Sequence, residues 1–259
     1  TKPVDDMDTL PIAGGPLMFN FIEITKWDGR GPTSQVIANI EEITQWSNNE
    51  PNRIGKNISN QLFELTTPRE NTGIYNSNPP CIMGILNVTP DSFFDGGKYN
   101  DVQLAIERGE KMVEAGADII DVGGESTRPG AEPISEHEEL NRVIPVIEAL
   151  AASGKQVSID TRRASVMREA AKAGAKMIND ISALSNTENL EAAAETGLPV
   201  VLMHSNADPR TMQNNPSYLN APLEVFKYLR KRIIAAESIG IPKNRIIIDP
   251  GIGFAKTVF

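Results

Sequence analysis

Six short apolar runs in the second part of the sequence each end in a polar or ionisable residue. The runs are CIMGIL before Asn87, DII before Asp121, QVSI before Asp160, KMI before Asn179 and Asp180, VVLM before His204, and RIII before Asp249. A single Asp at a strand end is as typical of a helix cap as of a binding site. Six such positions in succession make capping a weak explanation for the whole set. The pattern therefore predicts ligand-binding groups gathered at the ends of several strands.

Two polar loops follow the first two runs. The first, NVTPDSFFDGG from Asn87, carries two carboxylates, and a solvated surface loop is its alternative interpretation. The second, GGESTRPG from Gly123, has small residues that let the backbone approach a ligand. Its Arg128 supplies a planar guanidinium that can bind an anion. This loop is therefore the candidate anion site.

The charge of the chain makes such a local site necessary for any anionic substrate. Lys and Arg total 25 against 34 Asp and Glu, a formal charge of −9, so the net field opposes an approaching anion. No run of Lys or Arg is present, which argues against nucleic acid as a partner. No uncharged stretch is apolar enough to span a membrane. The single Cys81 forms no intramolecular disulfide, so we expect a cytoplasmic or mitochondrial protein that is not secreted.

The elements that position these residues follow an alternating pattern. Helix-like stretches separate the apolar runs, and several end next to a glycine that suits a left-handed C-cap: Val102–Ala115, Ser135–Ala152, Arg163–Ala173, Thr187–Thr196 and Pro222–Ile239. Alternating strands and helices predict an α/β fold with a parallel sheet. A doubly wound sheet gathers ligand residues at one switch point, whereas a TIM (β/α)8 barrel collects them from most strands. The pattern favours the barrel.

The first part of the chain reads differently. Residues 1–78 are irregular, and a polar linker, SNPP, precedes the alternating region at 79–259. Phe19, Phe21, Ile22 and Ile24 predict a strand, and WDGRG predicts a turn. Thr33 or Ser34 is then expected to cap a helix with Val36, Ile37, Ile40 and Ile43 on one face. We interpret this part as a fragment of an α/β unit without a catalytic constellation.

The second part of the chain contains two long motifs, GILNVTPDSF at Gly84–Phe93 and DIIDVGGESTRPGA at Asp118–Ala131. These motifs resemble those of the dihydropteroate synthases, folate-pathway enzymes that sulfonamides inhibit. Supporting motifs are SIDT at Ser158–Thr161, AGAKMINDIS at Ala173–Ser182, LMH at Leu202–His204 with TMQ at Thr211–Gln213, and IIIDPGIGFAK at Ile246–Lys256. The resemblance covers about Cys81 to Lys256. It implies a barrel that joins 6-hydroxymethyl-7,8-dihydropterin diphosphate to 4-aminobenzoate.

The resemblance also implies roles for the strand-end residues. Asp249 should hold the 2-amino and N3 edge of the pterin, since a carboxylate accepts from adjacent N–H donors. Asp160 and Asn179 should contact other pterin edges, and Met203 should pack on the ring. His204 invites a general-base role, but the family does not require one, and we favour an imidazole fixed by its neighbours. His137 is expected to be solvated.

Further residues are implied for the diphosphate and the second substrate. Asn87 should be a ligand of Mg2+, the expected cofactor, and Thr127 and Arg128 should hold the diphosphate. Asp95 should lie near the cation that forms when diphosphate leaves, and Arg128 neutralises that leaving group, so these two are the candidate catalytic residues. Phe254 is expected near the aminobenzoate, and Lys256 is the other cation available to an anionic substrate. A homodimer formed through the barrel is also implied.

Some features depart from the family pattern. Phe94, Asn206-Ala207 and Ala255 replace residues that are usual in the family, which concerns the first loop and the aminobenzoate rim. The family pattern continues after Lys256 with two further strand–helix units, so we expect a C-terminally incomplete barrel here. Residues 1–78 are a candidate tail of an upstream pterin pyrophosphokinase, because some eukaryotes fuse that enzyme to the synthase.

Two other interpretations remain open. One is a pterin-binding methyltransferase barrel, although a methyl donor has no diphosphate for the GGESTRPG loop and Arg128 to hold. The other is a catalytically inactive fragment that binds pterin weakly or serves only for interaction. A coupled assay for dihydropteroate formation separates these interpretations from a synthase.

Overall fold

A computed structural model of the 259-residue chain describes residues 9–28, 31–49, 53–68, 80–89, 98–125, 133–205 and 217–256. The chain divides into two compact units, Thr1–Glu70 (unit 1) and Asn71–Phe259 (unit 2). The boundary predicted from the sequence, between residues 78 and 79, lies outside the described residues. Each unit is described by itself.

Unit 2 contains a six-stranded parallel sheet whose strands follow the order of the chain. The spatial order is β10-β9-β8-β7-β6-β5, and every neighbouring pair is parallel. The strands are β5 (Met83–Asn87), β6 (Ile119–Gly123), β7 (Val157–Asp160), β8 (Met177–Asp180), β9 (Val200–Met203) and β10 (Ile246–Asp249). A doubly wound sheet would reverse this order at a switch point. The unbroken order is that of a partial (β/α)8 barrel, as the sequence predicted.

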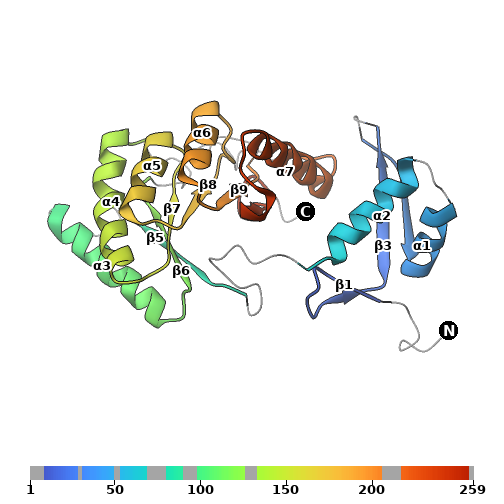
Figure 1. Cartoon of the computed structure of the whole chain (residues 1–259), viewed down its shortest axis with the longest axis horizontal. Coiled ribbons are helices and arrows are strands. Elements are labelled where there is room, and N and C mark those ends of the chain that lie inside the picture. The colour runs from blue at the N-terminus through green and yellow to red at the C-terminus, as the bar shows by residue number, and fades with distance from the viewer. Residues whose placement is uncertain are drawn as a thin grey trace. The chain divides into compact units, whose positions relative to one another are not determined.

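Helices connect the strands and lie side by side along one side of the sheet (Figure 1). They are α3 (Lys98–Glu114), α4 (Glu136–Ala152), α5 (Ala164–Ala173), α6 (Thr187–Thr196) and α7 (Ala221–Ser238), with a 3-10 turn, η3 (Lys243–Arg245), before β10. Side-chain oxygens of Ser135, Asn186 and Asn220 accept backbone N–H groups in the first turns of α4, α6 and α7. Gly174 and Gly197 end α5 and α6 in the left-handed conformation. The predicted helices and these glycine caps are therefore confirmed.

Alternate residues of each strand lie on opposite faces of the sheet. The helix-facing face packs against the helices in one buried apolar cluster, to which the sheet contributes Leu86, Ile120, Val122, Val157, Ile159, Ile178, Val200 and Leu202. The opposite face, here called the inner face, has a small apolar cluster of its own, formed by Ile119, Met177 and Val201 with Met83 and Ile247. These five residues lie toward the N-terminal ends of their strands. The inner face is therefore apolar at one end, which leaves its other end for polar side chains.

Unit 1 corrects one prediction. A helix was expected from Thr33 or Ser34, but residues 32–39 form strand β4 (Pro32–Asn39), which pairs antiparallel with β3 (Phe21–Trp27). The helix α1 (Ile40–Asn49) begins later, where the Asn39 side chain accepts from Glu42 N (2.8 Å) and the Glu42 side chain accepts from Asn39 N (3.0 Å). This reciprocal capping box fixes the start of the helix.

Other elements of unit 1 were not predicted from the sequence. They are the short strands β1 (Leu10–Pro11) and β2 (Met18–Phe19), which pair with each other, and helix α2 (Arg53–Thr66). The strand expected over Phe19, Phe21, Ile22 and Ile24 is confirmed from Phe21 onward as β3, whereas Phe19 ends the separate strand β2.

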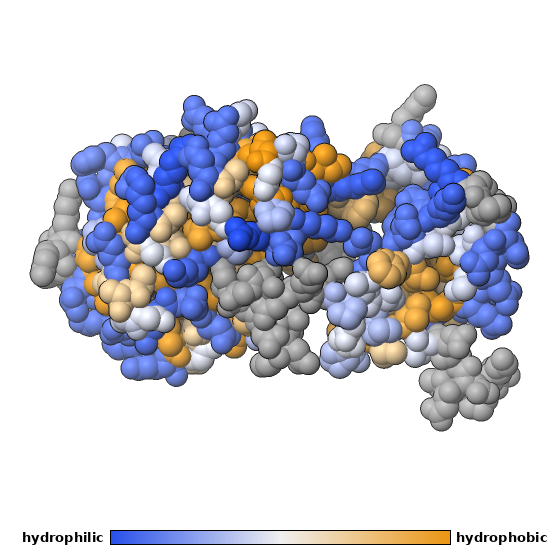
Figure 2. All heavy atoms as spheres, viewed as in Figure 1, coloured by the Kyte–Doolittle hydropathy of each residue, from blue (hydrophilic) through white to orange (hydrophobic). Residues whose placement is uncertain are grey.

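The surface is mainly hydrophilic with scattered apolar patches (Figure 2). Two apolar residues of α7, Phe226 and Ile234, are 53% and 56% exposed. Within the described ranges, we find no helix with the length and apolar character that crossing a membrane requires.

Candidate functional site

Five of the residues predicted to bind substrate or metal lie at the C-terminal end of the inner face. Asn87, Asp160, Met203 and Asp249 end β5, β7, β9 and β10, and Asn179 is one residue from the end of β8. The register places Asp160 beside Asn179 and Asp249 beside Met203. Because the strands are parallel, these side chains share one rim of the sheet. The structure thus gathers four polar side chains and one methionine from five strands.

Gly123 makes room for two of these groups. A Cβ atom placed on Gly123 would lie 3.4 Å from Asp160 Oδ2 and 3.5 Å from Asn87 Oδ1. The two oxygens therefore converge over the glycine from the strands on either side of β6. Within the described part of the chain, no hydrogen bond occupies the Asn87 or Asp160 side chain, which leaves both available to a ligand.

The environment of Asp160 is strongly acidic. Burial holds the pKa of the Asp160 carboxyl well above its ordinary value, and the negative charges around it raise the pKa further. Those charges belong to Asp121, Asp180, Glu139 and Glu125. Asp160 thus binds a proton more readily than a solvated Asp, and it favours a ligand that brings hydrogen-bond donors or positive charge.

Asp121 lies beneath this rim rather than on it. β6 continues to Gly123, so Asp121 occupies the inner-face position next to Ser158, one layer below Asp160. It is 3% exposed, and its Oδ2 accepts a hydrogen bond from Asn179 Nδ2 at 2.8 Å. Burial raises the pKa of Asp121, and the hydrogen bond from Asn179 partly offsets that rise. The sequence pattern placed Asp121 at a strand end and gave it no role.

Lys256 supports the opposite side of the rim. Its Nζ donates to the carbonyl oxygens of Gly251 (2.8 Å) and Phe254 (3.0 Å) and lies 3.1 Å from His204 Nδ1. Partial burial lowers the pKa of Lys256, and the nearby charge of Asp249 opposes that shift. Lys256 therefore provides a fixed ammonium group close to Asp249.

A close backbone approach orients Asp249. Gly251 has φ +64°, and a Cβ on it would lie 2.2 Å from the carbonyl oxygen of His204, so only glycine fits. The Gly251 N–H donates to Asp249 Oδ1 at 2.7 Å. One carboxylate oxygen of Asp249 is thus held by the backbone, which fixes the orientation of the other.

The side chain of His204 is buried against its neighbours and is not exposed at the rim. It is 1% exposed, and its ring makes an edge-to-face contact with Tyr228, with the ring centroids 4.9 Å apart. Together with the Lys256 contact, this packing agrees with an imidazole fixed by its neighbours. His137 is exposed, 3.0 Å from Asn141 Nδ2 through its Nδ1.

Sequence reasoning missed an ionic network that anchors the loop after β6. Glu125 pairs with Arg162 (3.1 Å) and Arg163 (3.2 Å), and Arg163 also pairs with the buried Glu139. Thr161 Oγ1 donates to Glu139 Oε1 at 2.6 Å. In the sequence, the two consecutive arginines after the SIDT motif, Arg162 and Arg163, were the feature that could have indicated this network. This network ties the start of the GGESTRPG loop to α4 and to the loop after β7.

Three predicted site residues, Asp95, Thr127 and Arg128, lie outside the described residues. Phe254 is partly buried in the segment that carries Lys256. No group of three or more His, Cys, Asp or Glu side chains among the described residues could hold a metal ion. The side-chain oxygen of Asn87, which converges with Asp160 Oδ2 over Gly123, is a hard donor of the kind that Mg2+ prefers.

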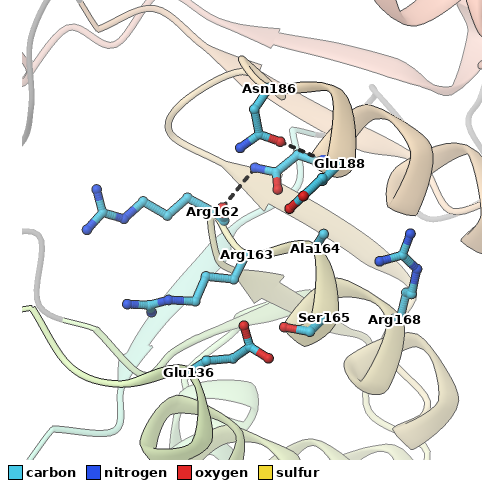
Figure 3. Close-up of a pocket in the computed structure, with 9 residues that line it drawn as sticks. Glu136, Arg162, Arg163, Ala164, Ser165, Arg168, Asn186 and Glu188 are labelled. Atoms are coloured by element: carbon cyan, nitrogen blue, oxygen red, sulfur yellow. Dashed lines mark hydrogen bonds between the residues drawn. The ribbon is translucent and has the colours of Figure 1, made fainter.

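A separate pocket of about 320 Å3 opens around the first turn of α5. Figure 3 shows Arg162 and Arg163 extending to the same side, with Arg168 on the other side of the helix start. Glu125, Glu139 and Glu195 pair with these arginines. The pocket contains none of the predicted site residues; it is lined by Glu136, Arg162, Arg163, Ala164, Ser165, Arg168, Asn186, Glu188 and Asn189.

Comparisons with known proteins agree with this geometry. The sequence profile of a family described as "pterin binding enzyme" matches residues 83–259. The dihydropteroate synthase of Escherichia coli K12 is 53% identical over 180 residues, which are 69% of this chain and 64% of that protein. The chain therefore spans slightly less than two thirds of that relative.

Solved structures of dihydropteroate synthases are also similar to this chain. The structure of Yersinia pestis dihydropteroate synthase with a sulfonamide drug complex has a TM-score of 0.66 and 48% identity, covering 71% of this chain and 67% of that one. The structure of the Xanthomonas albilineans enzyme with 4-aminobenzoic acid has a TM-score of 0.64 and 50% identity, covering 69% and 63%.

Proposed function

Because the chain belongs to the family of pterin-binding enzymes, we propose that it forms the pterin-binding part of a dihydropteroate synthase. The reaction joins 6-hydroxymethyl-7,8-dihydropterin diphosphate to 4-aminobenzoate and releases diphosphate. The observation that carries the proposal is the gathering of five polar or pterin-packing side chains at one end of the inner face: Asn87, Asp160, Asn179, Met203 and Asp249. Relatives with 4-aminobenzoic acid or a sulfonamide bound support it.

Asp249 would read the 2-amino and N3 edge of the pterin. The Gly251 N–H already holds Asp249 Oδ1, so the carboxylate is oriented before a ligand arrives and less entropy is lost on binding. Asp160 and Asn179 would contact other edges of the ring, where Asn179 offers its amide oxygen as an acceptor. The flexible thioether of Met203 would pack on the ring face.

The diphosphate would bind on the Asn87 side of the rim. Asn87 would hold Mg2+ through its side-chain oxygen, a hard neutral donor that suits the ion. The bound ion would neutralise charge on the leaving diphosphate. Thr127 and Arg128 would hold the same group, in a loop whose first residues are anchored by Glu125.

The chemistry needs no nucleophilic side chain. Diphosphate leaves a CH2 group attached to an electron-rich dihydropterin, so the resulting cation is resonance-stabilised, and Asp95 would lie near it. The neutral amine of 4-aminobenzoate then attacks that carbon and loses a proton. Phe254 would lie near the aminobenzoate ring. A sulfonamide would bind in the place of 4-aminobenzoate.

Calorimetry and a coupled assay test the proposal. The full chain should bind 6-hydroxymethylpterin, and with both substrates and Mg2+ it should form dihydropteroate. Asp249→Ala should abolish pterin binding, whereas Arg128→Ala should mainly weaken capture of the diphosphate. Glu188→Ala, in the separate pocket, is the control and should leave pterin binding unchanged. Absence of pterin binding by the folded chain would refute the proposal, and binding without product would refute the synthase activity.

A homodimer is the proposed assembly. Phe226 and Ile234 expose apolar surface on α7, and a second copy covering them would remove that surface from water. Analytical ultracentrifugation of the full chain and of Phe226→Ser tests this, since the proposal predicts a dimer that the substitution weakens.

A further inference from the structure

The buried carboxylate of Asp121 decides how Asn179 is presented to a ligand. Asp121 is 3% exposed, and it lies one layer below the rim. Its Oδ2 accepts a hydrogen bond from Asn179 Nδ2 at 2.8 Å. An ionised carboxylate accepts hydrogen bonds and cannot donate them. The amide nitrogen of Asn179 therefore faces Asp121.

The other end of the amide is left for the ligand. The amide group of Asn carries one carbonyl oxygen and two N–H donors. Asp121 accepts from one of these donors, which fixes the amide so that its oxygen points away from Asp121. No hydrogen bond to Asn179 Oδ1 forms within the described part of the chain. The register sets this oxygen next to Asp160, which lies at the rim of the candidate site.

We propose that Asp121 is a positioning residue that holds the amide oxygen of Asn179 toward the ligand, and so makes this corner of the site select a ring N–H. The proposal rests on the pterin-binding function proposed above. A ring that presents a lone pair at this corner would leave a buried acceptor unpaired, which costs affinity. Asp121 acts through Asn179 and does not itself contact the ligand.

Substitutions at the two positions test the pairing. Asp121→Leu removes the acceptor and frees the amide to rotate, so pterin affinity should fall about tenfold, the loss expected for a hydrogen bond to a charged group. Asn179→Asp sets two carboxylates against each other and should weaken binding at least as much. The swap Asp121→Asn with Asn179→Asp restores a donor below and an acceptor above. It should recover binding to within about threefold of the wild type, as expected for strongly coupled neighbours.

Met177→Leu is the matched control. Met177 lies two residues before Asn179 on the same inner face, beside Ser158 in the register, and is 1% exposed. Replacing it with a side chain of similar volume disturbs the same buried face without touching Asp121 or the amide of Asn179. Pterin binding by this variant should equal that of the wild type, measured by calorimetry on the full chain.

A second measurement separates this inference from the proposed function. The side-chain amide protons of Asn179 should exchange slowly with solvent in the ligand-free wild type by NMR, and fast in Asp121→Leu. If the wild type binds no pterin, the proposed function fails while this exchange difference still supports the pairing. Equal exchange in both proteins, or equal pterin affinity in folded wild type and Asp121→Leu, would overturn the inference.

Discussion

The two faces of the six-stranded sheet are built from the same strands, yet they carry opposite chemistry. The helix-facing face is apolar along most of its length and is buried under the helices except at β10, where Ile248 is 53% exposed. The inner face is apolar only near the N-terminal strand ends and becomes polar toward the rim. Because side chains alternate along a strand, one short segment serves both faces. The comparison shows that alternate residues of one strand can pack in the apolar core and place polar groups at the rim.

Strand β8 shows the contrast between adjacent residues. Asp180 lies on the helix-facing side, and its carboxylate accepts from Ser182 N (2.7 Å), Ser182 Oγ (2.6 Å) and Leu184 N (2.9 Å). Asn179 lies on the inner face, where its Nδ2 donates to Asp121. Its Oδ1 accepts no hydrogen bond among the described residues. Asp180 therefore holds the loop that follows the strand, while Asn179 is available to a ligand.

The largest effect should come from the apolar face. Leu202→Ala removes a fully buried side chain and should lower the free energy of unfolding of unit 2 by about 3 to 4 kcal/mol. Urea denaturation followed by circular dichroism measures the loss. Ile248→Ala, on the same face but 53% exposed, is the control and should change stability by less than about 0.5 kcal/mol. Similar losses in both variants would break the comparison.

Asp180→Ala should have the next largest effect on stability. It leaves the partly buried donors of Ser182 and the buried N–H of Leu184 without their acceptor, which should cost about 2 kcal/mol. Asp160 ends the neighbouring strand β7, and its side chain forms no hydrogen bond among the described residues. We therefore expect Asp160→Ala to weaken pterin binding without a comparable loss of stability. Urea titrations and calorimetry on both variants distinguish the two roles. A loss of stability in Asp160→Ala and a loss of pterin binding alone in Asp180→Ala would contradict the assignments.

A smaller loss is expected at the start of a helix on the apolar side. The Asn186 side chain accepts from Asn189 N at 2.7 Å, and Asn186→Ala should reduce stability by about 1 kcal/mol. Asn186→Ser retains a capping oxygen and should retain most of the stability. An Asn186→Ala variant as stable as the wild type would show that this cap contributes nothing.

The smallest change concerns pH and the inner face. The folded-state pKa of Asp160 is above its ordinary value of 3.8, so the native state binds more protons than the unfolded state between those two values. The stabilisation that this proton gives is complete below pH 3.8 and is lost as the pH rises through the folded pKa.

Asp160→Asn should remove this part of the pH dependence and raise stability at neutral pH. The direction follows from burial of the carboxyl, which is the main cause of its raised pKa. Urea titrations from pH 3 to pH 8 measure the change. An identical pH profile in wild type and variant would contradict the assignment.

Much of unit 2 could be predicted from the sequence. Continuous apolar runs between amphipathic stretches predicted six parallel strands, and the structure confirms all six. Glycines after the helices predicted left-handed caps, confirmed at Gly174 and Gly197. The motif-based resemblance to dihydropteroate synthases is confirmed by the family match and the identities to relatives.

The remaining features depend on contacts between distant parts of the chain. Asp121 was placed at a strand end, but strand pairing extends β6 by two residues and so lowers Asp121 beneath the rim. The partners of Glu125 are 37 and 38 residues away along the chain, so no local pattern revealed them. In unit 1, Val36 and Ile37 fit a helix face as well as a strand, and pairing with β3 decided the outcome.

The gap over Gly123 has a practical consequence. Its backbone is not in the left-handed region, and a methyl group there would meet the Asn87 and Asp160 oxygens at ordinary contact distance. Gly123→Ala should therefore fold correctly, with its added methyl group filling the space between the Asn87 and Asp160 oxygens. Compounds that bind the wild type but not this variant would be those that reach the space between Asn87 and Asp160. The variant could therefore be used in inhibitor screening to select compounds that bind there.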